Sequence, residues 1–258
     1  MLPALALCAV LAQELPPPTY KYDVVSIRPA NPEERNSGFS PGPQGGLRAR
    51  NDTAMDLLTF AYDARDYQFL GAPAWAKNDR FEIVLTPDKA DVVPDGPMSR
   101  EQLDGWLVRN RQRMQAVLHD RFGLVLRAET RELPLYVLTI GKGGHKLAAP
   151  ADPKRGINFN INNGQTINAR SSTMRMLCDA LARLLGHFVR DETGLDGSFD
   201  FKMDFARIAA DPAEANSSDP ARPSIFTALS EQLGLRLESK KGPVPVLVID
   251  KLERPTEN

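Results

Sequence analysis

The residues that most often bind transition metals or attack substrates are scarce in this chain. Its three histidines, His119, His145 and His187, lie far apart, and no His-x-x-x-His or Cys-x-x-Cys spacing occurs. We therefore predict no zinc site. Cys178 falls on the apolar face of a predicted helix, which favours a buried thiol over a nucleophile paired with His187. His119 lies beside Asp120 near a predicted helix end, where an imidazole is stabilised by the helix dipole, so a structural role is favoured over a catalytic one.

Three carboxylates, Asp191, Asp196 and Asp200, flank a turn that contains Gly194 and Gly197. They are the weak candidates for a metal site, because carboxylate oxygens are the ligands of calcium, but their spacing does not match the twelve-residue calcium loop. Glycines that allow positive φ explain the turn more simply. Scattered carboxylates could also converge in space as the centre of a hydrolase, which we keep as the alternative function.

Two further segments could bind a ligand. The glycines and lysines of residues 141–146 could hold an anion, but they lack the P-loop pattern and do not precede a helix, so a flexible linker is favoured. Trp75 lies in the loop that begins Gly71-Ala72-Pro73 and is the aromatic residue that we expect to contribute to a contact surface, although core packing is the common role of tryptophan.

Composition excludes several classes of partner. The chain has 258 residues, 42% hydrophobic and 25% charged, so it can form hydrophobic cores. Its 32 basic and 33 acidic residues leave a net charge of −1 without a basic patch, which argues against nucleic acid. No motif calls for a cofactor, so none is predicted.

Residues 1–12 are uncharged and mostly apolar, and Val10 and Ala12 have the small-residue spacing of a signal-peptidase site. We predict a signal peptide cut before Gln13, and therefore a periplasmic or secreted protein. A start site upstream of Met1 would account for the missing basic residues. Leu7 is too large for a lipobox before Cys8, and no later segment is long and apolar enough to span a membrane.

An internal repeat is the main indication of architecture. Residues 117–126 align without a gap on 228–237, and 134–138 on 245–249, both at an offset of 111 residues. Upstream matches, 49–53 with 169–173 and 80–83 with 198–201, have offsets of 120 and 118. A repeat of about 100 residues suggests a duplicated domain rather than a solenoid.

Hydrophobic periodicity predicts the elements of each copy. In the first copy we expect strands at 22–27, 47–51, 67–70 and 81–85, a helix that begins after Asp52 or Thr53, and a helix at 99–122. In the second we expect strands at 166–170 and 199–205, a helix after Ser172 or Thr173, a mobile loop at 208–222 and a helix capped by Ser224. Gly123 and Gly234 should end the last helix of each copy with left-handed geometry, and hairpins at 124–140 and 235–252 should follow.

The expected fold is therefore α+β, with two tandem similar domains, each built as strand-helix-strand-strand-helix-strand-strand with helices on a small mixed or antiparallel sheet. The predicted boundaries are 13–46 for the extended leader, first strand and loop, 47–147 for the first repeat, 148–164 for the linker, 165–252 for the second repeat and 253–258 for the tail.

Two resemblances to known families bear on this expectation. The first is a resemblance to the small amino-terminal periplasmic domain of secretins and signalling TonB-dependent receptors. It is carried by residues 177–186 and by 228–235 leading to 246–249, and it implies a non-enzymatic docking module. From Tyr22 to Asn258 the chain is similar to a family of exported proteins expanded in soil Acidobacteria, through segments 22–29, 120–124, 132–136, 141–147, 191–197 and 243–250. That family has no assigned activity; some relatives are joined to membrane metallopeptidase sensors, which implies sensing or partner binding.

The sequence thus favours an exported binding or signalling protein, more an adaptor than an enzyme, that docks a protein or peptide in the cell envelope. The strand around Asp23 and Val25 has no counterpart in the second copy, so it could leave a sheet edge that accepts an extended peptide, together with Trp75. Completion of a sheet within the first copy is the simpler role for this strand.

Overall fold

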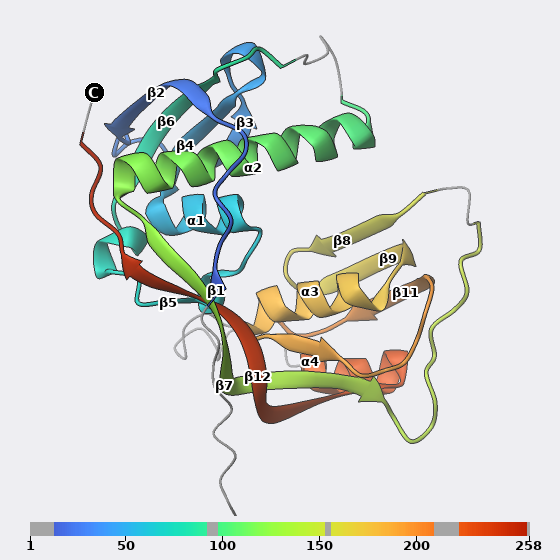
Figure 1. Ribbon diagram of the computed structural model, residues 1–258. Coiled ribbons are helices and arrows are strands. Elements are labelled where there is room, and N and C mark those ends of the chain that lie inside the picture. Colours follow the sequence, from blue (N-terminus) through green and yellow to red (C-terminus); the bar gives the residue numbers. More distant parts are fainter. Residues whose placement is uncertain (1–12, 92–97, 153–155, 209–221, 257–258) are drawn as a thin grey trace, which may run out of the picture. The chain divides into compact units, whose positions relative to one another are not determined.

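The computed structural model describes residues 13–91, 98–152, 156–208 and 222–256, in two compact units (Figure 1). Unit 1 contains the described residues up to Arg131 together with those from Pro245 onward, and unit 2 is Glu132–Val244. The predicted signal peptide at 1–12 and most of the loop expected at 208–222 lie outside the described residues.

Four α-helices and twelve strands make up the described chain. The helices are α1 (Ala54–Tyr62), α2 (Arg100–Phe122), α3 (Met174–Leu185) and α4 (Ile225–Ala228), with the π-helical turn η6 (Leu229–Leu233) directly after α4 and the 3-10 turns η1 (Pro43–Gly45), η2 (Asp66–Gln68) and η3 (Ala74–Lys77). The strands are β1 (Gln13–Glu14), β2 (Tyr22–Pro29), β3 (Gly38–Pro41), β4 (Leu47–Thr53), β5 (Phe69–Leu70), β6 (Arg80–Pro87), β7 (Val125–Ile140), β8 (Asn158–Asn162), β9 (Thr166–Ser172), β10 (Val189–Asp191), β11 (Phe199–Asp204) and β12 (Leu235–Lys251).

In unit 1, a four-stranded antiparallel sheet has the order β2-β6-β4-β3, and α1 and α2 pack against one of its faces (Figure 1). Alternate residues of the strands, such as Leu47 and Ile83, face the helices and are fully buried. Leu58 of α1 and Leu118 of α2 complete the same apolar core.

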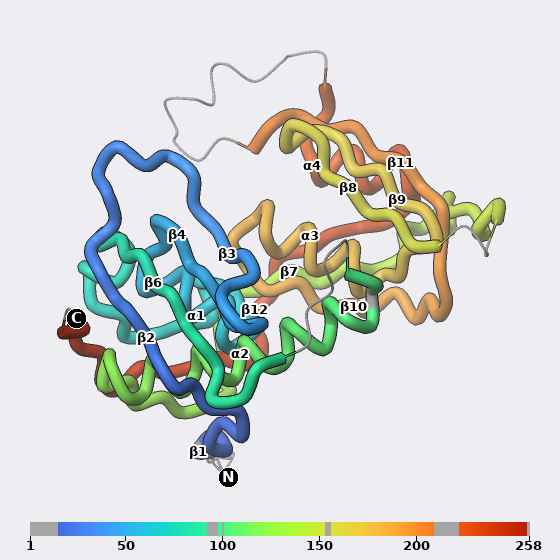
Figure 2. Tube along the Cα trace, turned by 90° about the horizontal axis from the view of Figure 1, so that it is seen from above, coloured from blue at the N-terminus to red at the C-terminus, as the bar shows by residue number. Residues whose placement is uncertain are grey.

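In unit 2, the strands β8, β9 and β11 form a three-stranded antiparallel sheet with β9 in the centre (Figure 2). Its buried face carries Ile167 and Met203, and α3 contributes Leu177 and Leu181 to the core of the unit. β8 and β9 are joined at Asn163 and Gly164, which both have positive φ, as a tight hairpin turn requires.

The predicted hairpins at 124–140 and 235–252 are wrong, because each region is one continuous strand. β7 runs for 16 residues and β12 for 17, and the two are neighbours in a sheet of order β1-β7-β12-β5. Neither strand has an Asn-Gly or Asp-Gly turn pair, and Pro134 and Pro245 are compatible with extended backbone. β7 begins in unit 1 and ends in unit 2, and β12 begins in unit 2 and ends in unit 1.

The helix boundaries follow local chemistry as predicted. Thr53, Ser99, Thr173 and Ser224 are the N-caps of α1, α2, α3 and α4, and each side chain accepts a hydrogen bond from a backbone N–H in the first turn. Gly123 and Gly234 follow the ends of α2 and η6 with φ of 57° and 67°. The left-handed C-terminal glycines are thus confirmed.

The fold is mixed α+β with several small sheets, as expected. Four strands were not predicted, namely β1, β3, β8 and β10. β3 lies in a segment rich in glycine and proline and β8 in one rich in asparagine, and these residues are poor strand formers, so propensity alone does not reveal them.

Candidate functional site

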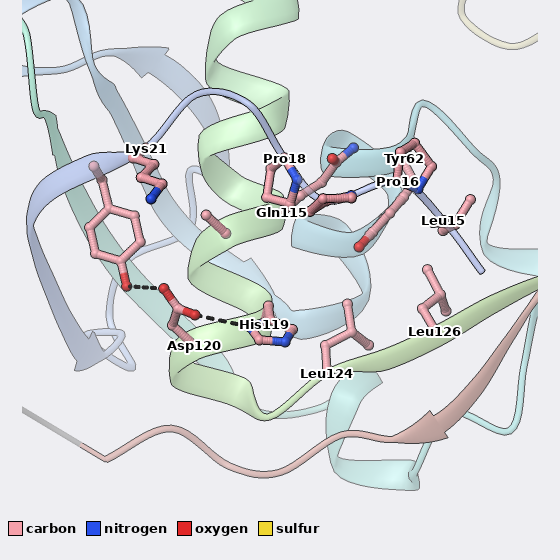
Figure 3. A pocket seen from close by; sticks show the side chains of 13 residues that line it. Leu15, Pro16, Pro18, Lys21, Tyr62, Gln115, His119, Asp120, Leu124 and Leu126 are labelled. Carbon is pink, nitrogen blue, oxygen red and sulfur yellow. Dashed lines mark hydrogen bonds and ion pairs between the residues drawn. The ribbon is translucent and has the colours of Figure 1, made fainter.

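Unit 1 has a pocket with a volume of about 750 Å³. It lies between the leader of the chain, the end of α1, the C-terminal half of α2 and the start of β7 (Figure 3). Its lining residues are Leu15, Pro16, Pro17, Pro18, Lys21, Tyr22, Tyr62, Gln115, Ala116, His119, Asp120, Leu124 and Leu126.

One wall of the pocket is apolar. Leu124 and Leu126 follow the glycine that ends α2, and Tyr62 comes from the last turn of α1. Ala116 lines the pocket from α2 and is nearly buried, so a small side chain leaves space where a larger one would fill it. Burial raises the pKa of Tyr62 to about 12, which keeps its hydroxyl neutral. This wall can bury part of an apolar ligand.

The leader forms a strap, residues 15–21, that is fixed at both ends. Before it, β1 pairs with β7 through Gln13 opposite Ala128 and Glu14 opposite Arg127. At its other end, the N–H groups of Thr19 and Tyr20 donate to Gln112 Oε1 at 3.1 and 3.3 Å.

Between these anchors the strap has few backbone hydrogen-bond donors. Its three prolines have no N–H to donate, and Pro16 and Pro17 are exposed. Side chains of the strap, including those of Leu15 and Pro18, line the pocket (Figure 3). The strap therefore covers the pocket without backbone N–H bonds from its proline segment.

A polar row lies at the other end of the pocket. Tyr22 Oη donates to Asp120 Oδ2 at 3.2 Å, and Asp120 Oδ1 is 2.9 Å from His119 Nδ1 (Figure 3). Burial, and then the charge of Asp120, raise the pKa of Tyr22, so this hydroxyl stays protonated as a donor. The side chain of His119 is 75% exposed, so it is available to a ligand. The row can hydrogen-bond a polar group of a ligand at this end of the pocket.

Trp75 is held by its own chain. Its ring packs edge to face on Phe81, with centroids 6.5 Å apart, and the Arg254 guanidinium lies 5.3 Å from the centroid of the indole ring. Arg254 also pairs with Asp79 at 2.7 Å. The tail of the chain thus contacts the indole that we expected to contribute to a contact surface.

β2 pairs with β6 and completes the four-stranded sheet, the simpler role expected for it, and it is an edge strand of that sheet. Asp23 is exposed and falls where the register with β6 shifts, whereas Val25 is 5% exposed and belongs to the core. The two residues therefore differ in role: a change at Val25 disturbs the core as well as the strand edge.

The three candidate carboxylates have separate environments. Asp191 accepts hydrogen bonds from the N–H and the hydroxyl of Thr193, at 2.9 and 2.7 Å, and Asp196 is exposed. Asp200 accepts from the N–H groups of Ala151 and Ser171, which lower its pKa. Within the ranges that the structure describes, no three His, Cys, Asp or Glu side chains are grouped to hold a metal ion.

Two further predictions concern unit 2. Cys178 is buried, as predicted, and burial raises its thiol pKa to about 12, which makes it unreactive. In the glycine-rich segment 141–146, several amides are bonded within the chain. Gly141 N–H donates to Gly234 O at 2.9 Å, and Lys146 N–H donates to Leu233 O at 2.8 Å.

The pocket was not predicted from the sequence. One signal was present: Gln112, Gln115, Ala116 and His119 are spaced so that they lie on one face of α2. That polar face could have indicated a surface for another segment of the chain. The partner segment, the strap, lies about 100 residues earlier, and no local pattern connects the two.

Comparison with known proteins identifies the family but not an activity. The part of the chain that the structure describes has no helix with the length and apolar character needed to cross a membrane. No curated protein and no solved structure matches the chain. The sequence profile of one family, described as a protein of unknown function (DUF3738), matches residues 55–252. The chain therefore belongs to the DUF3738 family.

Proposed function

We propose that the chain is an exported binding protein that takes an apolar segment of a peptide or protein partner into the pocket beneath the strap. The observation that carries this proposal is the pocket of about 750 Å³ in unit 1, which combines an apolar wall with a polar row at one end. Binding sites commonly have this combination, because apolar area supplies affinity and a few polar groups fix orientation.

The strap supports a peptide as the class of ligand. It is itself an extended, proline-rich peptide whose side chains, among them Leu15 and Pro18, line the pocket. A partner segment of similar character would contact Tyr62, Leu124 and Leu126 and present a polar group to His119. Extended, proline-rich segments lose little conformational entropy on binding, which favours recognition of this kind.

The alternative, a hydrolase with carboxylate chemistry, has weaker support. Asp191 and Asp200 each accept two hydrogen bonds from neighbouring groups, a use that stabilises turns and strand ends. The pocket of unit 1 contains one carboxylate among its lining residues, that of Asp120. We therefore favour binding over hydrolysis.

Export and duplication complete the proposal. Cleavage of the predicted signal peptide before Gln13 would place the new amino terminus at β1, directly before the strap. We further propose that the two units descend from one duplicated domain of the kind seen in secretins and TonB-dependent receptors.

Matched local features support a duplication. Asn51 and Ser171, which are 120 residues apart, both have positive φ just before a helix. Phe69 lies beside Leu247 in unit 1 and Val189 beside Tyr136 in unit 2, both in parallel pairs. Val189 follows Phe69 by 120 residues and Leu247 follows Tyr136 by 111 residues, which are the offsets of the sequence repeat. The last strand of each sequence copy therefore lies in the unit that contains most of the other copy.

Site-specific photo-crosslinking tests the binding proposal. A benzophenone amino acid replaces Leu126, which lines the pocket, or the adjacent Val125, which is 50% exposed. Neighbouring residues of a strand point to opposite faces, so Val125 is the matched control. In the native cell envelope, we expect position 126 to form a discrete crosslink and position 125 to form none. Equal crosslinking at both positions, or none at 126, would contradict the proposal.

A further inference from the structure

The outer face of the three-stranded sheet in unit 2 is a polar grid. Residues opposite one another in antiparallel strands share a face. Asn160 of β8 is opposite Asn168 of β9, which is opposite Lys202 of β11. The neighbouring rows are Asn162-Thr166-Asp204 and Asn158-Arg170, with Asp200 at the bulge of β11.

The opposite face of the same sheet is apolar. Phe159 and Phe201 meet at a centroid distance of 6.3 Å, and Ile167 and Met203 are fully buried. The alternation explains why the outer positions are polar, since antiparallel sheets often have one solvated face. It does not explain why four of these positions hold asparagine.

Asparagine is depleted in strands, where β-branched residues pack better, so four on one face act against strand stability. The outer face of the sheet in unit 1 provides a comparison. Its paired positions include Ser26 opposite Val84, Val84 opposite Arg48, and Val24 opposite Thr86. None of these residues is asparagine, so the amides are particular to unit 2 rather than general to solvated sheets of this chain.

The grid also contains a shallow depression of about 450 Å³, lined by Asn158, Asn168, Ala169, Arg170, Asp200, Phe201 and Lys202. Within it, Arg170 Nε is buried and has no hydrogen-bond acceptor in the described structure. Because this atom is not accessible, a ligand in the depression would meet the amides of Asn158 and Asn168 instead.

Charges of both signs lie within the grid. Arg170 and Lys202 are matched by Asp200 and Asp204, Lys202 Nζ lies 3.2 Å from Asp204 Oδ2, and Arg222 Nη1 approaches Asp204 Oδ1 at 3.9 Å from outside the grid. Charges of both signs do not select an anion or a cation. Amide side chains, by contrast, both donate and accept, as the hydroxyls of sugars do.

We propose that this face, which we call the amide face (Asn158, Asn160, Asn162, Asn168 and Arg170), binds a neutral oligosaccharide. The sugar lies on the sheet with its hydroxyls paired to the amides. This is a second site, in unit 2, and it does not depend on the pocket of unit 1.

Nuclear magnetic resonance of the ¹⁵N-labelled chain from Gln13 onward tests the site, with cellohexaose and maltohexaose as probes. We expect one or both sugars to shift the side-chain amide signals of Asn158, Asn160 and Asn168 with a Kd of about 1 mM, as for roughly 4 kcal/mol of binding free energy. Absence of shifts with both sugars at about 10 mM, ten times that Kd, overturns the proposal.

A triple variant, Asn158→Thr, Asn160→Thr and Asn162→Thr, separates binding from structure. Threonine is the better strand former, so we expect the melting temperature to stay equal or rise while affinity falls at least about tenfold. Ser26→Thr on the outer face of unit 1 is the control and should leave sugar binding unchanged. A lower melting temperature of the triple variant with unchanged sugar binding shows that the amides serve the fold, and overturns the proposal. Shifts of the same signals by tetragalacturonate alone overturn the neutral class.

Discussion

The two units use similar elements and differ where a ligand could bind. Each has an antiparallel sheet, a helix capped by threonine, and a later helical segment ended by a left-handed glycine. In unit 1 that later helix, α2, has 23 residues, whereas in unit 2 α4 and η6 have four and five. Residues of α2 hold the strap and line the pocket. The shared elements thus account for the fold, and the strap held against α2 accounts for the candidate site.

A second difference lies on the sheets. The outer face in unit 2 carries amides, whereas the paired positions compared on the outer face in unit 1 carry no asparagine. Features that both units share are explained by caps, glycines and core packing. The pocket beneath the strap in unit 1 and the amide face in unit 2 differ between the units, and we propose binding at these two features.

The largest expected effect concerns the two C-terminal glycines. A Cβ at Gly234 would overlap the carbonyl oxygen of Gly144, which is backbone, whereas a Cβ at Gly123 would meet Glu253 Oε2, which can move. Gly234→Ala should lower the free energy of unfolding by about 2 to 4 kcal/mol, and Gly123→Ala by about 1 kcal/mol. Urea denaturation measures both. Equal losses would show that the glycines have the same surroundings in the two units.

Asp91 is next, because it serves the N-terminal part of α2, which has no counterpart among the described residues of unit 2. It accepts hydrogen bonds from Arg113 Nη1 at 2.6 Å and Arg109 Nε at 3.0 Å, and the Arg113 side chain is 1% exposed. Asp91→Asn should lower the free energy of unfolding by about 2 kcal/mol, since a buried guanidinium loses its counter-charge. Asp63→Asn is the matched control, because it removes an exposed partner of Arg111 on the same helix, and it should cost less than about 1 kcal/mol. Equal losses in urea denaturation would contradict the role of burial.

The ion pairs of Asp91 with Arg113 and Arg109 make the free energy of unfolding depend on pH. Burial opposes ionisation of Asp91, but the hydrogen bonds from Arg113 and Arg109 outweigh it and hold its pKa below the usual value. The folded pKa is thus lower than the unfolded one, so this stability is present above about pH 4 and is lost as the pH falls further. Asp91→Asn should therefore lose less stability than the parent chain below about pH 4.

Asp52 is expected to make the free energy of unfolding depend on pH in the opposite direction. It is 3% exposed, and burial followed by the charge of Asp56 raises its pKa to about 6. The folded pKa lies above the unfolded value of about 3.9, so the stabilisation is complete below about pH 4 and is lost as the pH rises through about 6. Asp52→Ser, which copies Ser172 of unit 2, should remove this pH dependence. The variant should gain on the order of 1 to 2 kcal/mol at about pH 7 relative to the parent. An unchanged slope of stability between about pH 4 and 7 would refute the role of Asp52.

The smallest effect distinguishes the two threonine caps. Thr53 and Asp56 form a capping box, with Asp56 N–H donating to Thr53 Oγ1 at 3.1 Å and Thr53 N–H donating to Asp56 Oδ2 at 2.8 Å. Thr173 accepts only a longer bond, from Met176 N–H at 3.4 Å. Thr53→Ala should cost about 1 to 2 kcal/mol and Thr173→Ala about 0.5 kcal/mol. A larger loss at Thr173 would reverse the comparison.

The sequence predicts what local chemistry decides. Caps such as Thr53 and Ser99, the left-handed Gly123 and Gly234, and the buried Cys178 each depend on neighbours within a few residues. The long strands β7 and β12 were missed because whether a chain folds back or continues depends on its distant strand partner. The pocket was missed for the same reason, since the strap meets α2 across about 100 residues of sequence.

Titration with the fluorescent probe 1-N-phenylnaphthylamine tests most directly whether the pocket of unit 1 binds an apolar ligand. The chain from Gln13 onward is compared with Ala116→Phe, which fills the pocket, and with Ala116→Ser, which preserves its size. We predict saturable binding by the parent and the serine variant and an affinity at least about tenfold lower for the phenylalanine variant, a difference of about 1.4 kcal/mol. Equal probe affinity in the parent and a folded Ala116→Phe variant would contradict the account.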